Sequence, residues 1–156
     1  MTSAGGRWRR SFALIVPGAL VAALSACTNE NPSLRIVSVV PPANAPIRFS
    51  DVQLIFDRSC AKSGCHVTGV VPQGLNLESG MSYALLVGVR STEDSSFYRV
   101  EPCAVEPCAI DQSYLIKKIE GTQTVGPRMP PDGSPFLPEA EVQVIKDWIK
   151  EGAPND

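Results

Sequence analysis

The chain has 156 residues, 44% of them hydrophobic, and this length suits one domain of about 100 to 150 residues without room for a second large one. Glycine and proline, with 12 and 14 copies, make up about a sixth of the chain, so much of it is expected to be loop and a long coiled coil is excluded. The formal charge of −2 provides no basic surface for a phosphate backbone, which argues against a nucleic-acid-binding protein.

Residues 1–26 are typical of an export signal. Three arginines and no acidic residue precede the apolar run 13–24, whose twelve residues are too few for a bilayer core that needs about 20. The segment ends in Leu24-Ser25-Ala26-Cys27, which resembles the lipobox of bacterial lipoproteins. Cleavage before Cys27 would leave its thiol to carry a diacylglycerol, unless the cysteine follows an ordinary signal by chance. We therefore expect a protein anchored by lipid to the bacterial cell envelope, on the periplasmic side or at the outer membrane.

The exported part of the chain is predicted to be a tether followed by one domain. Removal of residues 1–26 would take away three arginines and no acid, which changes the formal charge from −2 to −5. Residues 27–48 are polar and then proline-rich, as in a semi-rigid linker, and residues 49–156 are left as the folded domain. The four remaining cysteines would lie in an oxidising compartment, where thiols are disulfide-bonded, modified or metal-bound.

Four segments with apolar residues at helical spacing predict an all-α fold of three to four helices joined by long loops. The expected helices are residues 51–59, 81–87, 112–120 and 138–150. Ser50 with Gln53 has the form of a capping box for the first helix, and Asp111 is a fair N-cap for the third. Gly121 ends the third helix, and Pro138 at the first helical position opens the last. The buried stripe expected on the last helix is Val142, Ile145, Trp148 and Ile149.

The segment Cys60-Ala-Lys-Ser-Gly-Cys65-His66 carries the chemistry of this sequence. Two cysteines with a histidine directly after the second are the signature of covalent haem c attachment, because two thioethers to the porphyrin hold the next residue beneath the iron. His66 is the single histidine of the chain, so no other imidazole could bind that iron. Four residues separate the cysteines instead of the common two, and Ser63-Gly64 offers the backbone freedom to bulge the extra residues outward.

The segment Arg128-Met129-Pro130-Pro131 suggests a second axial ligand. A thioether is a soft, neutral donor that favours ferrous iron, and two prolines would preorganise the loop that carries it. Met129 could instead serve only to pack the loop. The competing Met81 is expected inside a helical stretch, where filling the core is the usual role of a methionine.

A haem would add apolar contact area to a domain with few aromatic residues and many loops. The candidates for the haem wall are Phe56, Leu77, Leu115, Ile119 and Trp148. Packing of these side chains on one another is equally compatible with the pattern.

The order of first helix, Cys-Cys-His, loops and helices, Met-Pro loop and terminal amphipathic helix resembles a small class I cytochrome c, in which the first and last helices cross. More closely, over about residues 48–154, the chain is similar to the cytochrome-c-like haem-binding domains of planctomycete and myxobacterial exported proteins. The segments that carry this likeness are Ile55-Phe56, Gly74 to Leu77, Ser113 to Ile116, Arg128 to Pro130 and Trp148 to Ala153.

The resemblance implies a single covalent haem c. Cys60 and Cys65 would be its thioether donors, with His66 as the proximal and Met129 as the distal axial ligand. It further implies single-electron transfer between redox protein partners at the envelope, without catalysis by the domain itself.

Cys103 and Cys108 bracket four residues, and a proline precedes each of them. In an exported protein this pattern predicts a short loop closed by a disulfide. No histidine follows either cysteine, so a second haem is not expected.

Other functions remain compatible with the sequence. In a haem-free interaction module of a lipoprotein, Cys60 would bond Cys65 and Cys103 would bond Cys108. A structural zinc site would need adjacent Cys65 and His66 to bind the same tetrahedral ion, which strains ordinary ligand spacing. An enzyme is disfavoured, because the chain has no second histidine and no nucleophile placed beside a base.

Overall fold

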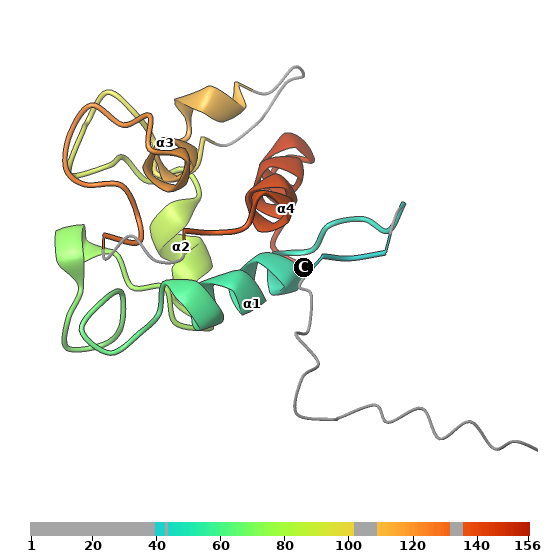
Figure 1. The fold of residues 1–156 in the computed structure, drawn as a ribbon, viewed down its shortest axis with the longest axis horizontal. Helices are drawn as coiled ribbons and strands as arrows, with labels where there is room; N and C mark the ends of the chain where they lie inside the picture. The colour runs from blue at the N-terminus through green and yellow to red at the C-terminus, as the bar shows by residue number, and fades with distance from the viewer. Residues whose placement is uncertain (1–39, 43, 102–108, 132–135) are drawn as a thin grey trace, which may run out of the picture. The chain divides into compact units, whose positions relative to one another are not determined.

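The computed structural model describes residues 40–42, 44–101, 109–131 and 136–156, all within one unit, Ile36–Asp156. The export signal, the proposed lipid anchor Cys27 and the Cys103–Cys108 pair lie outside the described residues. The elements are α1 (Phe49–Ser59), η2 (Pro72–Gly74), α2 (Ser82–Leu86), η3 (Ile110–Gln112), α3 (Tyr114–Glu120) and α4 (Glu139–Lys150), as Figure 1 shows. This part of the chain contains isolated bridges but no strand, which confirms the predicted all-α class. Among its helices, none combines the length and the apolar character that crossing a bilayer requires.

Helix α1 begins earlier than predicted, and the capping box expected at Ser50 is wrong. Arg48 is the N-cap, with an extended backbone (φ −100°, ψ 157°), and its N–H donates to the Asp51 carboxylate at 3.0 Å. Gln53 is buried and turns inward, where its Nε2 donates to the Leu77 carbonyl at 2.9 Å. The acidic residue therefore caps the helix, while Gln53 ties it to a loop.

The other helices follow their predicted signals with small shifts. Helix α2 lacks one residue at each end of the predicted segment 81–87. Helix α3 begins two residues late, because residues 110–112 form η3 and Ser113 takes the N-cap position expected for Asp111. Gly121 ends α3 as predicted, with φ +82° and its N–H on the Lys117 carbonyl at 2.9 Å. Helix α4 ends at Lys150 as predicted, with Pro138 at the N-cap and not at the first helical position.

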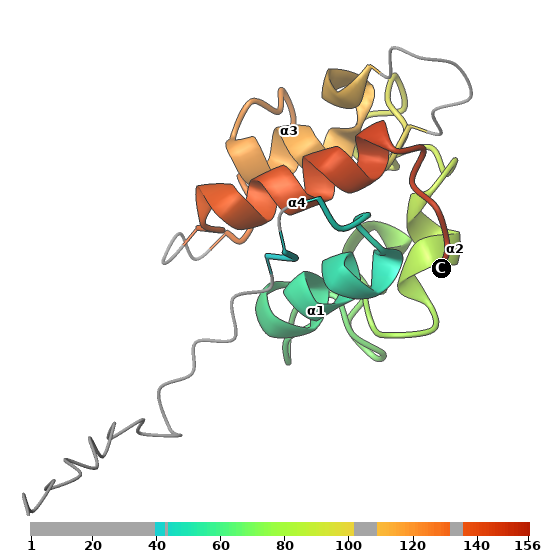
Figure 2. The ribbon, with the colours of Figure 1, turned by 90° about the vertical axis from the view of Figure 1, so that its right-hand side faces the viewer.

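The core lies between α4 and its two neighbours. Figure 2 shows α4 running between α3 and α1, and the contacts between these pairs agree. The side chains of the predicted stripe on α4 are all buried and meet buried residues of α1 and α3: Val142, Ile145, Trp148, Ile149, Val52, Ile55, Phe56, Ile116 and Ile119. Trp148 is fully enclosed, with its ring centre 5.3 Å from that of Phe49, and its Nε1 donates to the Pro154 carbonyl at 2.9 Å.

Polar side chains hold the loops that join the helices. The Glu78 carboxylate accepts from the Thr68 N–H at 2.7 Å and from the Asn76 side-chain amide at 2.9 Å, which closes the segment 68–78 on itself. Figure 1 shows the loops that follow α1, α2 and α3 on the same side of the domain, away from the C-terminus. These loops supply most of the walls of the site described next.

Candidate functional site

A hollow lies where the end of α1, the loops after α1 and α2, helix α3 and the segment 129–131 meet. Its cavity volume is about 240 Å³, and it is partly open to solvent. Known ligand pockets span roughly 300–1,000 Å³, so the enclosed part of the hollow alone lies slightly below that range. Six leucine and isoleucine side chains line it: Leu75, Leu77, Leu86, Leu115, Ile119 and Leu137.

Both cysteines of the sequence motif line this hollow. Cys60 directly follows α1, and its N–H donates to the Phe56 carbonyl at 2.8 Å. Cys65 follows a turn in which its N–H donates to the Lys62 carbonyl at 2.8 Å, and Gly64 in that turn has φ +81°. The two thiols are half-buried and are not joined by a disulfide. The extra residues of the motif thus form a turn of their own, which relies on the backbone freedom of Gly64.

His66 is held in one orientation by the backbone. Its Nδ1 lies 2.9 Å from the Leu75 carbonyl oxygen, its N–H donates to the Cys60 carbonyl at 3.3 Å, and its own carbonyl accepts from the Leu77 N–H at 2.9 Å. A carbonyl can only accept, so Nδ1 carries the proton in this bond, and Nε2 of a neutral ring is left with a free lone pair. A hydrogen bond of this kind on the far nitrogen is what orients and strengthens a histidine that binds a metal.

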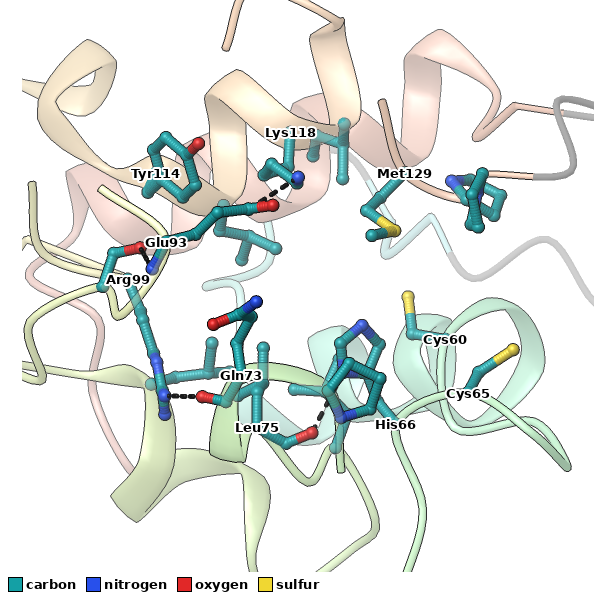
Figure 3. Close-up of a pocket in the computed structure, with 18 of the residues that line it drawn as sticks. Cys60, Cys65, His66, Gln73, Leu75, Glu93, Arg99, Tyr114, Lys118 and Met129 are labelled. Atoms are coloured by element: carbon teal, nitrogen blue, oxygen red, sulfur yellow. Dashed lines mark hydrogen bonds and ion pairs between the residues drawn. The ribbon is translucent and has the colours of Figure 1, made fainter. Parts of the chain in front are cut away.

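Met129 lines the same hollow from the opposite wall. In Figure 3 it approaches from the side of α3, while His66, Cys60 and Cys65 lie on the side of α1. The backbone N–H of Met129 donates to the Lys118 carbonyl at 2.9 Å. Met81 does not line the hollow, and its expected core role is wrong, because its side chain is 48% exposed and its sulfur only accepts from Asn76.

Three of the five candidates for the haem wall, Leu77, Leu115 and Ile119, line the hollow. Phe56 and Trp148 do not, because both are buried in the core between the helices. Periodicity identified these two as buried, but it could not tell a core position from a cofactor wall.

The hollow has a polar side that the sequence analysis missed. Arg99, only 8% exposed, donates to the carbonyls of Leu85 at 2.8 Å and Gln73 at 2.5 Å, and burial lowers the pKa of its guanidinium. Lys118 and Glu93 form an ion pair of 2.7 Å, with side chains 9% and 17% exposed. Figure 3 shows these charged groups on the side of the hollow away from the cysteines. The one signal in the sequence was the position of Lys118 among the apolar residues of α3.

The Cys60 thiol is not set up as a reactive thiolate. Burial, followed by the nearby Cys65 and Glu141, raises its pKa to about 12. A thiol with so high a pKa stays protonated at neutral pH. In the described residues no three His, Cys, Asp or Glu side chains converge as a metal site, so Cys60, Cys65 and His66 do not form three corners of a zinc tetrahedron.

Comparisons with known proteins provide no relative. Neither the protein-family models, nor the curated proteins, nor the solved structures contain a match to this chain. The functional argument therefore depends on the residues of the hollow.

Proposed function

We propose that this protein is an exported, lipid-anchored monohaem c-type cytochrome of class I type, which passes single electrons between protein partners at the cell envelope. The observation that carries the proposal is the hydrogen bond that orients the imidazole ring of His66. The residue directly follows Cys65, and its Nδ1 is hydrogen-bonded to the Leu75 carbonyl at 2.9 Å, so Nε2 remains as a ligand atom beside an apolar hollow. The donor set suits covalent haem, because two unpaired thiols stand beside an oriented imidazole.

The opposite wall supports the same function. Met129 offers a thioether across the hollow from His66, and the six apolar side chains already named would enclose a planar, apolar ring. A haem iron bound by an imidazole and a thioether exchanges one electron, with the ferrous state favoured.

The polar side suits the carboxylates of such a cofactor. Among the described residues, the partners of Arg99 are backbone carbonyls, and Lys118 adds a second cation beside Glu93. A buried cation without a carboxylate partner favours an anionic group next to it. Arg99 and Lys118 would therefore hold the charged edge of the porphyrin and orient its apolar edge toward the cysteines.

The haem-free module stapled by disulfides is the competing hypothesis, and the unpaired state of Cys60 and Cys65 counts against it. The deciding experiment is expression with haem maturation factors, followed by a pyridine haemochrome spectrum and intact mass. We expect one covalent haem per chain in the wild type and none in a Cys60→Ala, Cys65→Ala double variant.

A matched control is the Cys103→Ser, Cys108→Ser double variant, which removes two other cysteines and should keep the haem. Colourless wild-type protein with Cys60 joined to Cys65 would refute the proposal. Haem that survives in the Cys60, Cys65 variant would refute the assigned attachment sites.

A further inference from the structure

The segment that carries Met129 is fastened to the end of α3 by two neighbouring hydrogen bonds. The Met129 N–H donates to the Lys118 carbonyl at 2.9 Å, and the Nε of Arg128 donates to the Ile119 carbonyl at 2.9 Å. The last four carbonyls of a helix lack partners within the helix, so these two would otherwise be unsatisfied. The two residues thus continue the hydrogen bonding of α3 and fix the segment against it.

Gly121 leaves space for the Arg128 side chain, because it has no side chain of its own. A Cβ added to Gly121 would lie 2.8 Å from Cδ of Arg128, a distance that real side chains do not show. Gly121 also needs its positive φ to end α3. The glycine therefore serves both the helix end and the close approach of the arginine.

Arg128 makes a third contact, beyond the Met129 segment. Its guanidinium carbon lies 3.7 Å from the ring centre of Phe136, which precedes α4. Stacking on an aromatic ring fixes the orientation of the planar guanidinium, and the attraction between its charge and the ring adds to this. Arg128 thus joins the end of α3 and the approach to α4, with Met129 attached next to it.

From these contacts we infer that Arg128 is the positioning residue for Met129, and that it keeps the thioether at the hollow and opposite His66. This inference rests on the proposed haem function. The role requires the Nε donor and the planar guanidinium, and a lysine has neither. A lysine at this position keeps the positive charge, so it separates positioning from a purely electrostatic effect on the iron.

The test uses the full chain with its haem attached and compares wild type with Arg128→Ala and Arg128→Lys. Free imidazole is titrated against the ferric protein, because it must displace a ligand on the Met129 side before it can bind. The charge-transfer absorption band of methionine-bound ferric haem reports the same bond directly. We expect both variants to bind imidazole about tenfold more tightly than wild type, which corresponds to the loss of about one hydrogen bond and its stacking contact. We also expect the charge-transfer band to weaken in both variants.

Arg90 provides a matched control. Its guanidinium lies 3.8 Å from the ring centre of Tyr98 and donates to the Ser96 carbonyl at 3.2 Å, so it makes the same kinds of contact without touching the Met129 segment. Arg90→Ala should leave the imidazole affinity and the band unchanged.

Three results would overturn the inference while the cytochrome proposal stands: an unchanged Arg128→Ala, full rescue by Arg128→Lys, or an equal effect of Arg90→Ala. A wild type without haem overturns the proposed function itself, and the inference falls with it.

Discussion

Two ion pairs of equal length in this domain should differ in strength, because they differ in burial. Lys118–Glu93 and Lys146–Glu120 are both 2.7 Å long. The first pair has side chains 9% and 17% exposed and lines the hollow, whereas the second has side chains 28% and 31% exposed. Water and salt screen the second pair far more than the first.

The perturbation is removal of one partner from each pair by Glu93→Gln or Glu120→Gln. Loss of one partner of a fully buried pair costs about 3–5 kcal/mol, whereas an exposed pair contributes about 0–1 kcal/mol. Because Glu93 and Lys118 keep some contact with solvent, we expect Glu93→Gln to lower the free energy of unfolding by about 2–3 kcal/mol. Glu120→Gln should lower it by less than about 1 kcal/mol.

The assay is urea unfolding of the haem-free chain, followed by circular dichroism, at low and high salt, because a haem carboxylate beside Lys118 would replace Glu93 as its partner. Lys118→Met and the Glu93→Gln, Lys118→Met double variant complete a double-mutant cycle. Lys146→Met and the Glu120→Gln, Lys146→Met double variant complete the matching cycle for the exposed pair. The double variant at the hollow should recover part of the stability lost in Glu93→Gln, because no charge is then left buried and unpaired. A coupling energy for Glu93 and Lys118 no larger than that for Glu120 and Lys146 would refute the reasoning from burial.

Four further predictions concern the core, the loops and the iron ligand. Trp148→Ala should lower the free energy of unfolding by about 3–5 kcal/mol in urea titrations, because it empties a fully buried site; a loss below about 1 kcal/mol would contradict the assigned core. Hydrogen bonds from Thr68 and Asn76 lower the pKa of the Glu78 carboxyl group. These bonds therefore contribute fully to stability at a pH above the ordinary glutamate pKa, and the contribution is lost as the pH falls through the lowered pKa. The difference in unfolding free energy between wild type and Glu78→Gln should therefore disappear at low pH, and a difference that is constant with pH would count against this account. Met129→Ala should lower the reduction potential or open the iron to added ligands, and a variant with the spectrum and potential of wild type would exclude Met129 as the ligand. Electron exchange with a basic partner should slow as ionic strength rises, because the chain left by the proposed cleavage before Cys27 would carry a formal charge of −5, and exchange that is independent of salt would exclude such a partner.

The helices were predictable to within a few residues, because their signals are local. Gly121 ends α3, and Lys150 ends α4, at the residues that the sequence indicates. The clearest error was at the start of α1, where Arg48 is the N-cap in place of Ser50 and its N–H donates to Asp51. Gln53, which the predicted capping box paired with Ser50, donates to the Leu77 carbonyl, a contact that lies 24 residues along the chain.

The candidate site was predictable only in part, for a similar reason. Cys60, Cys65 and His66 are found from their spacing, because the proposed attachment of one cofactor would require them to be close along the chain. Glu93 and Arg99 lie in the loop after α2, whereas Lys118 lies on α3, and no spacing marks the three as one group. Their association depends on how the loop after α2 packs against α3.

The amino-acid sequence alone determined that this domain is helical, where most of its helices begin and end, and that a Cys-Cys-His motif and a Met-Pro segment are present. Those features depend on backbone preferences and on residues a few positions apart. Only the tertiary structure decided three further features. The Leu75 carbonyl accepts a hydrogen bond from His66, Met129 lies across the hollow, and Arg128 fastens the Met129 segment to α3. Each of these contacts needs chain closure over a loop, and its stability depends on packing that no short stretch of sequence contains.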